Sequence, residues 1–443
     1  MSEKATTMSK PQNIKGMRDH LPKAMIGRQY IIDTLTGVFE RHGFEPMQTP
    51  ILEYAETLEG KIGDEERLIY RFDDHGGRRL ALRYDQTVPL ARVVAQYPND
   101  ITLPFRRYAV GQSYRGERPA RGRYREFWQV DLDLVGSASP LADAEVVAII
   151  DECLRALGFA GFTTQLNHRQ ILGGIARLAG LGEEAAGGVY RAIDKLDKIG
   201  ADGVCEELIK SGVAEDAAAR ILELVQLKGE NSDVLEALSE RLHGDERALA
   251  ALANLRTIAE NLRLMDVPEQ RFTITPSLAR GLSYYTGVVF ESVVESPPMG
   301  SLLGGGRYDE LIGQFAGRAL PTVGLAFGLE RLHDIMDELN MLPQASVADV
   351  FVTMFSPELA AESLAVAREL RAAGRNVEIA LDPAEKLGRQ FKHADRRGIP
   401  LAIIIGPDEQ ARGEIVIRDM GSGEQRSIKR DDVADAVHAA SPS

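Results

Sequence analysis

An arginine-rich stretch, Arg106–Asp133, constrains the fold of this chain more than any other segment. Its first twenty residues contain seven arginines and a single carboxylate, Glu117, although the whole chain has a formal net charge of −14. Such local basicity inside an acidic protein indicates a bound polyanion. The loop Gly116–Gly122 carries Pro119 and separates two extended runs, so the stretch is predicted to form a β-hairpin.

The second strand of this predicted hairpin has two chemically different faces. Alternation places six residues on one face: Arg123, Arg125, Phe127, Gln129, Asp131 and Asp133. The opposite face, which we expect in the core, holds Tyr124, Trp128, Val130, Leu132 and Leu134. A row of polar groups with one ring is costly to bury unless a ligand pairs with it. The hairpin is therefore predicted to form the binding floor for a phosphorylated molecule that carries a ring.

Length and composition narrow the class of protein. A chain of 443 residues is too long for one core, so two or three domains are expected. No apolar run approaches the ~18 residues of a membrane span, and the N-terminal residues lack the apolar centre of a signal peptide. The two cysteines, Cys153 and Cys205, lack metal-ligand spacing and indicate reduced thiols in the cytoplasm. The acidic balance argues against indiscriminate DNA binding, but local patches decide contact with nucleic acid.

The pattern of strand and helix signals divides the chain into parts. Strand signals run up to residue 167, disappear over 168–268 where helical periodicity dominates, and return over 269–340. This order predicts an α+β domain that carries a helical insertion. After a linker at 341–347, residues 348–443 alternate β and α, which predicts a separate small parallel or mixed α/β domain.

Two segments place polar groups next to predicted strand ends. In Leu82–Thr87, Asp85 and Thr87 could face the same way, although either residue could simply cap the helix that follows. Leu278–Glu291 contains Arg280 next to a glycine, followed by paired tyrosines. Taken alone, this segment is explained at least as well by a surface position for Arg280 and core packing of the tyrosines as by a ligand-binding site.

Two further segments are rich in glycine. Leu303–Asp309 has three consecutive glycines, which allow either close backbone approach to a ligand or a bulged turn between strands. It lacks the spacing of a phosphate loop. In Val323–Arg331, two glycines mark a strand-to-helix transition, and Arg331 on the helix could equally be solvated.

Taken together, in order and spacing, these segments resemble the class II aminoacyl-tRNA synthetases, and the histidyl-tRNA synthetases in particular. Gly43–Glu53, with its proline, is similar to the first class II motif, Phe105–Asp133 to the second and Gly324–Arg331 to the third. The stretches LARGLSYYTG and LGGGRYDEL are similar to segments particular to the histidine enzymes. The resemblance covers nearly the whole chain, with the helical insertion least specific.

The resemblance implies a fold and a division into domains. It implies a class II antiparallel-sheet catalytic domain in two parts, 1–167 and 269–340, interrupted by the helical insertion 168–268. It also implies a C-terminal α/β anticodon-binding domain over 348–443 and a homodimer built on the first motif.

The implied reaction is ATP-dependent activation of L-histidine followed by its transfer to the 3′ end of tRNA(His), with ATP and Mg²⁺ entering as a substrate complex. Catalysis then falls to Arg115 and Arg280, which hold the α-phosphate from opposite sides. The implied ATP ligands are Arg115, Glu117, Arg123, Phe127 and Arg331, with Phe127 and Arg331 stacking on adenine. No tightly bound cofactor, metal-ligand set or editing domain is expected.

Histidine needs polar anchors at both of its ends. By resemblance, Asp85, Thr87 and Gln129 hold the α-ammonium, with Gln86 in the same segment. Arg115 and Arg280 face the carboxylate, and the two imidazole nitrogens bond Asp133 and Tyr285, with Tyr284 nearby. A competing amino acid without an imidazole leaves these polar groups without hydrogen bonds. This allows discrimination of roughly 10⁴ against such amino acids without editing.

Recognition of tRNA shows one departure from the family pattern. Many relatives read an extra 5′ guanylate through a polar residue of the second-motif loop, where this chain has Ala120. A methyl group cannot donate to a base, so we expect a tRNA without that nucleotide, or recognition through Arg118 or Arg121. In the C-terminal domain, Lys392 and Arg396 are candidates for backbone contacts to tRNA, although a solvated helix face fits them equally well.

An alternative from another class is a non-catalytic relative, the regulatory subunit of ATP phosphoribosyltransferase. Such relatives usually lack the anticodon domain and lose the ligand arginines. This chain keeps residues 348–443 and all four arginines at positions 115, 123, 280 and 331, which favours the enzyme. A synthetase-like module that only binds RNA is disfavoured for the same reason.

Overall fold

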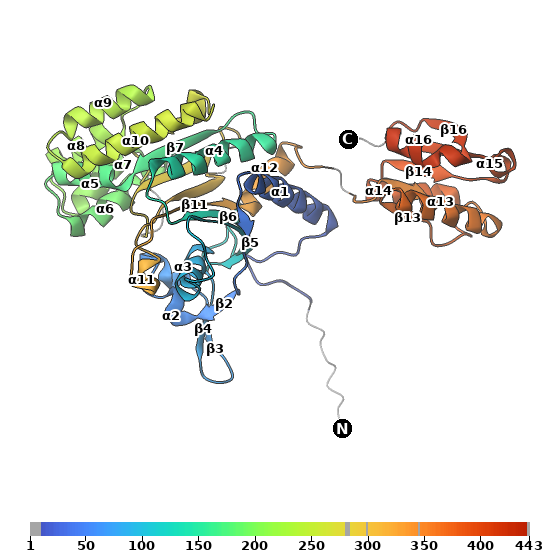
Figure 1. Cartoon of the computed structure of the whole chain (residues 1–443), viewed down its shortest axis with the longest axis horizontal. Coiled ribbons are helices and arrows are strands. Elements are labelled where there is room, and N and C mark those ends of the chain that lie inside the picture. The colour runs from blue at the N-terminus through green and yellow to red at the C-terminus, as the bar shows by residue number, and fades with distance from the viewer. Residues whose placement is uncertain (1–9, 280–283, 298–299, 344–345, 441–443) are drawn as a thin grey trace. The chain divides into compact units, whose positions relative to one another are not determined.

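The computed structural model describes residues 10–279, 284–297, 300–343 and 346–440, and the fold is α+β as predicted. The chain forms two compact units, one made of Met1–Asp19 and Ile31–Met341, the other of His20–Tyr30 and Leu342–Ser443 (Figure 1). The larger unit holds both long strands of the arginine-rich stretch, so it is the unit that matters for the site.

The larger unit is built on a sheet of eight strands, in the order β1-β5-β6-β11-β10-β9-β7-β8. The strands are β1 (Glu45–Pro46), β5 (Phe105–Tyr114), β6 (Glu126–Val135), β7 (Thr163–His168), β8 (Phe272–Ile274), β9 (Val288–Val293), β10 (Leu303–Arg307) and β11 (Thr322–Gly328). The two outer pairs, β1 with β5 and β7 with β8, are parallel, and every inner pair is antiparallel. The sheet is therefore mainly antiparallel, as expected, and the predicted arginine hairpin is its β5–β6 pair.

The apolar face of β6 packs against helix α1 (Pro22–Arg41), whose C-terminal half belongs to this unit. Phe39 of α1 lies 5.9 Å from the Tyr108 ring on β5 and 6.5 Å from the Phe327 ring on β11. Val130, Leu132 and Leu134 are buried there, as predicted. Trp128 is only half-buried, because it lies near the start of β6, where its backbone N–H donates to Glu330 of helix α12 (Leu329–Glu338).

Helices cover this sheet, and a run of helices forms the insertion between strands β7 and β8 in the sequence. Those outside the insertion are α2 (Ala55–Leu58), α3 (Thr87–Gln96), α4 (Pro140–Ala156), α11 (Gly313–Ala316) and α12 (Leu329–Glu338). Six more follow β7: α5 (Arg169–Leu178), α6 (Glu183–Ile193), α7 (Leu196–Lys210), α8 (Glu215–Val225), α9 (Asn231–Arg241) and α10 (Glu246–Leu264). Over the described residues this run contains no strand until β8, and α10 packs on both α4 and α5 (Figure 1).

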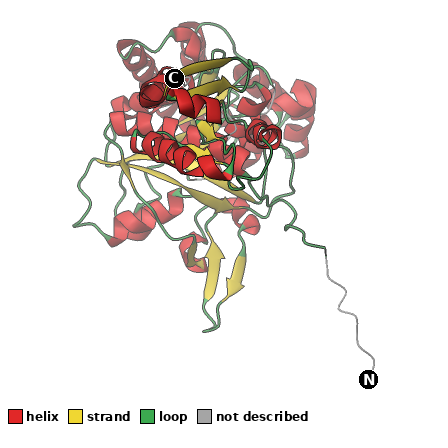
Figure 2. Cartoon of the chain, turned by 90° about the vertical axis from the view of Figure 1, so that its right-hand side faces the viewer, coloured by secondary structure: helices red, strands yellow, loops and turns green. Residues whose placement is uncertain are grey.

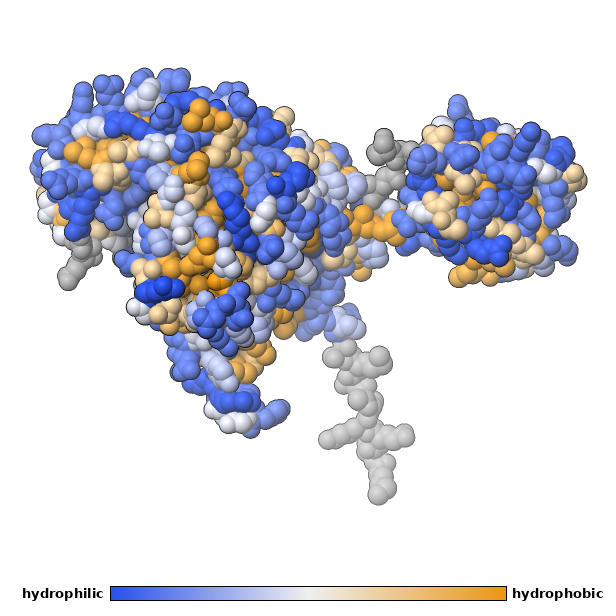
Figure 3. Space-filling model, viewed as in Figure 1, coloured by the Kyte–Doolittle hydropathy of each residue, from blue (hydrophilic) through white to orange (hydrophobic). Residues whose placement is uncertain are grey.

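A small three-stranded sheet, β2-β4-β3, projects from the large one (Figures 1 and 2). Its strands are β2 (Leu52–Tyr54), β3 (Arg71–Asp73) and β4 (Arg79–Leu82). Tyr54 and Phe72 both pair with Leu80, so all three side chains share one face with the Leu52–Leu82 pair. Leu52, Tyr54 and Phe72 are exposed, and Figure 3 shows hydrophobic residues near the base of the projection and hydrophilic ones at its tip.

The smaller unit has a five-stranded mixed sheet in the order β13-β12-β14-β15-β16. Its strands are β12 (Val350–Val352), β13 (Val377–Ile379), β14 (Leu401–Ile404), β15 (Glu414–Asp419) and β16 (Gln425–Lys429). Its helices after the linker are α13 (Ala360–Ala372), α14 (Leu387–Arg397), α15 (Pro407–Arg412) and α16 (Val433–Ala440). The mixed α/β prediction is thus confirmed. Across the described residues of the chain, no helix is both long enough and apolar enough to cross a membrane.

Candidate active site

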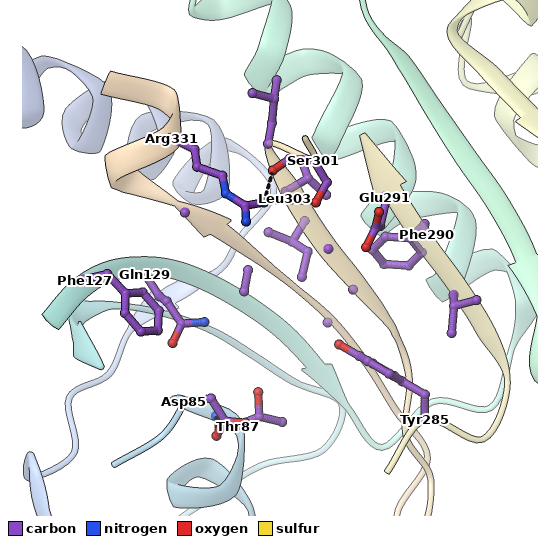
Figure 4. A pocket seen from close by; sticks show the side chains of 18 of the residues that line it. Asp85, Thr87, Phe127, Gln129, Tyr285, Phe290, Glu291, Ser301, Leu303 and Arg331 are labelled. Carbon is purple, nitrogen blue, oxygen red and sulfur yellow. Dashed lines mark hydrogen bonds between the residues drawn. The ribbon is translucent and has the colours of Figure 1, made fainter. Parts of the chain in front are cut away.

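The large sheet carries a cavity of about 270 Å³ on the polar face of β6 (Figure 4). The cavity brings together most of the residues singled out in the sequence: Asp85, Thr87, Arg115, Glu117, Arg123, Phe127, Gln129, Asp133, Tyr284, Tyr285 and Arg331. These come from separate parts of the chain, namely the start of α3, the β5–β6 hairpin, the segment before β9, and α12. Arg280 lies outside the described residues.

The floor of the cavity is the strand β6. Phe127, Gln129 and Asp133 alternate along it toward the cavity, as the period of the strand requires. Figure 4 shows Gln129 beside Phe127 on this strand, and its Oε1 is buried with no hydrogen-bond partner among the described residues. Gly324 of β11 pairs with Asp133, and a Cβ at this glycine would collide with the Asp133 carboxylate. Glycine in the neighbouring strand therefore makes the space that the carboxylate occupies.

Two neighbouring groups hold the carboxylate of Asp133. Arg107, fully buried on β5, approaches its Oδ2 to 2.6 Å, and the hydroxyl of Tyr308 donates to its Oδ1. Burial raises the pKa of the Asp133 carboxyl group, while the Arg107 charge and the Tyr308 hydrogen bond lower it. One of the seven arginines of the basic stretch thus supports the floor of the cavity and does not line the cavity itself.

Asp85 combines the two roles that its sequence left open. Its Oδ1 accepts hydrogen bonds from the backbone N–H of Thr87 (3.1 Å) and of Val88 (3.0 Å), which caps the first turn of α3. It also lines the cavity, where the Tyr284 hydroxyl donates to its Oδ2 at 3.4 Å. Burial raises the pKa of the Asp85 carboxyl group, against the effect of the backbone N–H groups.

Gln86 requires a correction, because it does not line the cavity. Its side-chain amide is buried and donates to the backbone oxygens of Gln129 (3.2 Å) and Ala109 (3.4 Å). Its own backbone oxygen accepts from Arg107. Adjacent residues at the start of α3 point in different directions, so Asp85 and Thr87 reach the cavity while Gln86 ties α3 to the sheet.

Arg115 lies at the edge of the cavity between two aromatic rings. Its guanidinium carbon is 4.1 Å from the centroid of Tyr84 and 4.9 Å from that of Phe127. Its Nε donates to the backbone oxygen of Tyr84 at 3.3 Å. Stacking on rings fixes the plane of a guanidinium and leaves its outer N–H groups directed away, a geometry suited to bidentate binding of an anion.

Arg123 and Arg331 come from different elements and line the same cavity. Arg123 belongs to the second-motif loop, Gly116–Arg125, and its Nε lies 3.1 Å from Oε2 of Glu117. Arg331 on α12 donates from Nη1 to the backbone oxygen of Ser301 (2.7 Å) and from Nε to that of Gly122 (3.1 Å). In Figure 4 Arg331 and Phe127 approach the cavity from different sides.

Sequence reasoning missed several lining residues, among them Glu291, Ser301, Leu303 and Tyr308. The three glycines are part of the strand β10, so the bulged-turn interpretation was wrong. Gly305 faces the Phe290 ring with no room for a Cβ, and Gly304 lines the cavity. Close backbone approach to a ligand, the other interpretation of the glycines, stays a prediction at this wall. Tyr308 is the tyrosine of the same LGGGRYDEL segment, and its place in that segment was the sequence signal that could have identified it.

A second, open groove of about 1710 Å³ lies between the second-motif loop and the inserted helices. Arg118, Ala120 and Arg121 line it from the loop, and Arg121 also pairs with Glu338 of α12. The insertion contributes further cations, namely Arg169, Arg177, Arg191, Lys195, Lys198 and Arg247. Lys392 and Arg396 lie on an exposed face of α14 in the smaller unit.

Comparisons with known proteins agree with this geometry. A family model described as histidyl-tRNA synthetase matches residues 16–332, and one described as anticodon binding domain matches 349–440. The chain is 41% identical to "Histidine--tRNA ligase" of Rhodopirellula baltica over 95% of this chain and 96% of that one. It is similar to the crystal structure of histidyl-tRNA synthetase from Nostoc sp. PCC 7120, with a TM-score of 0.88 and 35% identity over 97% and 99% of the two chains. It is also similar to "an ATP phosphoribosyltransferase regulatory subunit/histidyl-tRNA synthetase" from Bacillus halodurans, with a TM-score of 0.73 and 26% identity over 87% and 96%.

Proposed function

This chain belongs to the histidyl-tRNA synthetase family, and from that premise we propose how it acts as a histidine–tRNA ligase. It is an aminoacyl-tRNA ligase that joins L-histidine to tRNA(His) at the expense of ATP. The observation that carries the proposal is the convergence of Arg115, Arg123 and Arg331 with Asp85 and Asp133 around one cavity. Arginine guanidinium groups and carboxylates around one small cavity match a nucleotide beside an amino acid.

In the first step, an oxygen of the histidine carboxylate attacks the α-phosphorus of ATP, and the bond to the β-phosphate oxygen breaks to release pyrophosphate. Arg115, fixed between two rings, bridges the carboxylate and the α-phosphate. Arg280, outside the described residues, is proposed to hold the same phosphate from the other side. No covalent nucleophile of the protein is needed, so charge placed in advance is the main catalytic resource.

The rest of ATP is proposed to lie between the second-motif loop and α12. Arg123 and Arg331 hold the triphosphate, Phe127 and Arg331 stack on adenine, and Glu117 accepts from its amino group or orients the loop. Mg²⁺ enters with the nucleotide as part of the substrate.

Histidine is proposed to lie over β6 with its ammonium group toward Asp85, Thr87 and Gln129. A neutral imidazole offers one donor and one acceptor. Asp133 provides an acceptor, and burial raises the pKa of Tyr285, which keeps its hydroxyl protonated and able to donate. An apolar side chain in this place could form a hydrogen bond with neither group.

In the second step, a hydroxyl of the terminal ribose of tRNA attacks the carbonyl carbon of the adenylate, and AMP leaves. We assign the open groove beside the second-motif loop to the end of the tRNA, with Arg118, Ala120 and Arg121 as its loop contacts. Lys392 and Arg396 are proposed to contact the tRNA backbone in the anticodon-binding unit. We divide the chain into catalytic parts 1–167 and 269–340, a helical insertion 168–268 and an anticodon-binding domain 348–443.

We propose that the enzyme works as a cytoplasmic homodimer without DNA or membrane partners. Both cysteines are free thiols, as reducing conditions would leave them. The exposed apolar face of the small sheet, with Leu52, Tyr54 and Phe72, follows the first motif and is suited to a second copy of the chain. Sedimentation of a Phe72→Glu variant tests this surface, and the expected result is a shift from dimer to monomer.

The regulatory-subunit alternative is less well supported. One structural neighbour carries that title, at 26% identity, whereas the relatives at about 41% identity over nearly the whole chain are named as ligases. The anticodon-binding match also favours a protein that handles tRNA.

Exchange of labelled pyrophosphate into ATP, run with each amino acid in turn, tests the function. We expect exchange with histidine alone, and its absence would overturn the proposal in favour of the regulatory alternative. Gln129→Ala and Gln86→Ala make a matched pair, because only the first side chain lines the cavity. Gln129→Ala should raise the KM for histidine, while Gln86→Ala should lower stability and leave that KM nearly unchanged.

A further inference from the structure

A short N-terminal segment, Lys15–Arg18, lies against the second-motif loop although about a hundred residues separate them in sequence. We call it the N-terminal clasp. The backbone N–H of Arg125 donates to the oxygen of Gly16 at 2.8 Å, and Nη1 of Arg125 donates to the oxygen of Lys15 at 3.3 Å. Nε of the same arginine donates to the oxygen of Glu117 at 3.0 Å. Arg125 therefore ties both flanks of the loop to the clasp.

Gly16 is the point of closest approach. Its φ of +88° lies in the region that favours glycine. A Cβ at this position would lie 2.6 Å from Cγ of Pro119 and 3.0 Å from Cγ of Arg125. A side chain at position 16 would therefore meet the loop on both flanks, in addition to the backbone strain.

Arg18 extends the clasp to the helix that carries Arg331. Its guanidinium carbon is 3.6 Å from the centroid of the Tyr124 ring, and its Nη1 donates to the Tyr124 hydroxyl at 2.8 Å. That hydroxyl donates in turn to Oδ2 of Asp334 at 3.1 Å, and Arg18 lies 3.7 Å from Oδ1 of the same carboxylate. Asp334 lies on α12, three positions after Arg331 and so on the same side of the helix.

From these contacts we propose that the N-terminal clasp is a positioning element for ATP. It joins the second-motif loop to α12, so that Arg123 of the loop and Arg331 of the helix face the same cavity at a fixed separation. This inference rests on the proposed function of that cavity. Gly16 and Arg18 touch neither substrate in the proposed arrangement and act through Arg125 and Tyr124.

The clasp should affect the two substrates differently. The residues proposed to hold ATP belong to the loop and to α12, which the clasp joins. The residues proposed to hold the ammonium and imidazole groups of histidine lie on β6, at the start of α3 and before β9, and take part in none of the clasp contacts described above. A loosened clasp should therefore weaken ATP binding and leave histidine binding nearly intact, a split that general destabilisation would not produce.

The test compares Arg18→Ala, Arg18→Lys and wild type in histidine-dependent pyrophosphate exchange, together with a direct titration of each protein with Mg-ATP. Arg18→Ala should raise the KM for ATP about fivefold, since it loses a stacking contact and a charged hydrogen bond. The KM for histidine should stay within about twofold, because ground-state binding of histidine is untouched. Arg18→Lys keeps the charge without the planar fork and should fall in between.

A second pair of variants separates the contact from backbone strain. Gly16→Ala places a methyl group against the loop, whereas Gly212→Ala introduces alanine at an almost equal φ of +91° with open space around it. Gly16→Ala should weaken ATP binding and Gly212→Ala should not, even if both lower the melting temperature.

Equal effects on the two substrates, or none on ATP, would overturn the clasp proposal. If wild type shows no exchange with histidine, the proposed function fails, and the Mg-ATP titrations still decide the clasp. If wild type does not bind Mg-ATP either, both proposals fall.

Discussion

Two groups of arginines surround the same strand: a floor group, which is buried among protein groups, and a wall group, which lines the cavity. Arg83, Arg107 and Arg307 form the floor group and are almost completely buried. Their partners are protein groups: Arg83 donates to the Gln112 and Thr49 oxygens, Arg107 pairs with Asp133, and Arg307 pairs with Asp143 at 2.8 Å. The wall arginines, at positions 115, 123 and 331, line the cavity and rest on rings, loop carbonyls or a rim carboxylate.

The difference shows that burial and pairing, more than residue type, decide what an arginine does here. A buried cation must be balanced inside the protein, because an unpaired charge in the interior costs several kcal/mol. A cation at a cavity wall can keep part of its hydrogen-bonding capacity for a ligand. The floor group should therefore govern stability and the wall group activity.

The sharpest test removes a floor arginine. Arg107→Leu leaves the buried Asp133 and Asp131 carboxylates without their cation, and should lower the free energy of unfolding by about 3–5 kcal/mol. Urea denaturation followed by circular dichroism measures the change. Arg220→Leu, which breaks an exposed pair with Asp216 on α8, is the control and should cost about 0.5 kcal/mol or less. Equal losses of unfolding free energy in the two variants would contradict the division into floor and wall arginines.

Removal of a wall arginine should lower activity strongly and change stability little. Arg115→Ala removes the proposed bridge between carboxylate and α-phosphate, and should lower the exchange rate by about 10²–10³-fold. The melting temperature should stay within about 3 °C of wild type, since the lost contacts are rim contacts worth about 1 kcal/mol or less. A large loss of stability with little loss of activity would place Arg115 in the floor group instead.

A buried histidine extends the comparison to pH. His168 accepts from the N–H of Gln170 and caps α5, and burial, with the nearby Arg307 charge, lowers its pKa to about 4. A pKa depressed below its unfolded value means that the contribution to stability is present above about pH 6.5 and lost as pH falls toward 4. At pH 5 wild type should have lost about 2 kcal/mol through this residue.

His168→Asn keeps a capping acceptor and removes the titration, so its stability should depend less on pH over this window. Thermal unfolding of both proteins at pH 7 and pH 5 measures the difference. The same pH dependence in the variant would show that other groups control it.

The smallest effect is expected at Ala120, which lines the open groove beside the second-motif loop. Matched tRNA(His) transcripts with and without an extra 5′ guanylate should differ in kcat/KM by less than about tenfold, because alanine offers no donor to the base. Ala120→Gln supplies a donor and should increase the preference for the longer transcript. A requirement for the guanylate well above tenfold in wild type would contradict the prediction.

The sequence allowed much of this arrangement to be predicted, because alternation along β6 reports burial directly. Phe127, Gln129 and Asp133 were placed on the cavity face from spacing alone, and Val130, Leu132 and Leu134 on the core face. The α+β fold followed from the interruption of strand signals by a helical stretch. Family resemblance then connected segments that lie far apart in the chain.

The remainder depended on tertiary contacts that spacing does not report. Trp128 is half-buried because it lies near the strand start beside α12, and the Gln86 amide bonds backbone oxygens of β5 and β6 although both of its neighbours face the cavity. Arg107 could not be separated from the wall arginines, because nothing in the local sequence indicates that Asp133 pairs with it. Tyr308 was missed because its role depends on the same carboxylate.

Gly324 and Asp133 share one volume, and this has a consequence for redesign of the substrate pocket. Any larger residue at position 324 would displace the Asp133 carboxylate, so the side chain at 133 keeps its place only while glycine is at 324. Adaptation toward another amino acid would therefore have to pass through coordinated changes on two strands. Libraries that vary only one of the two positions should yield few folded variants. Libraries that vary both positions together should yield folded variants that neither single-site library contains.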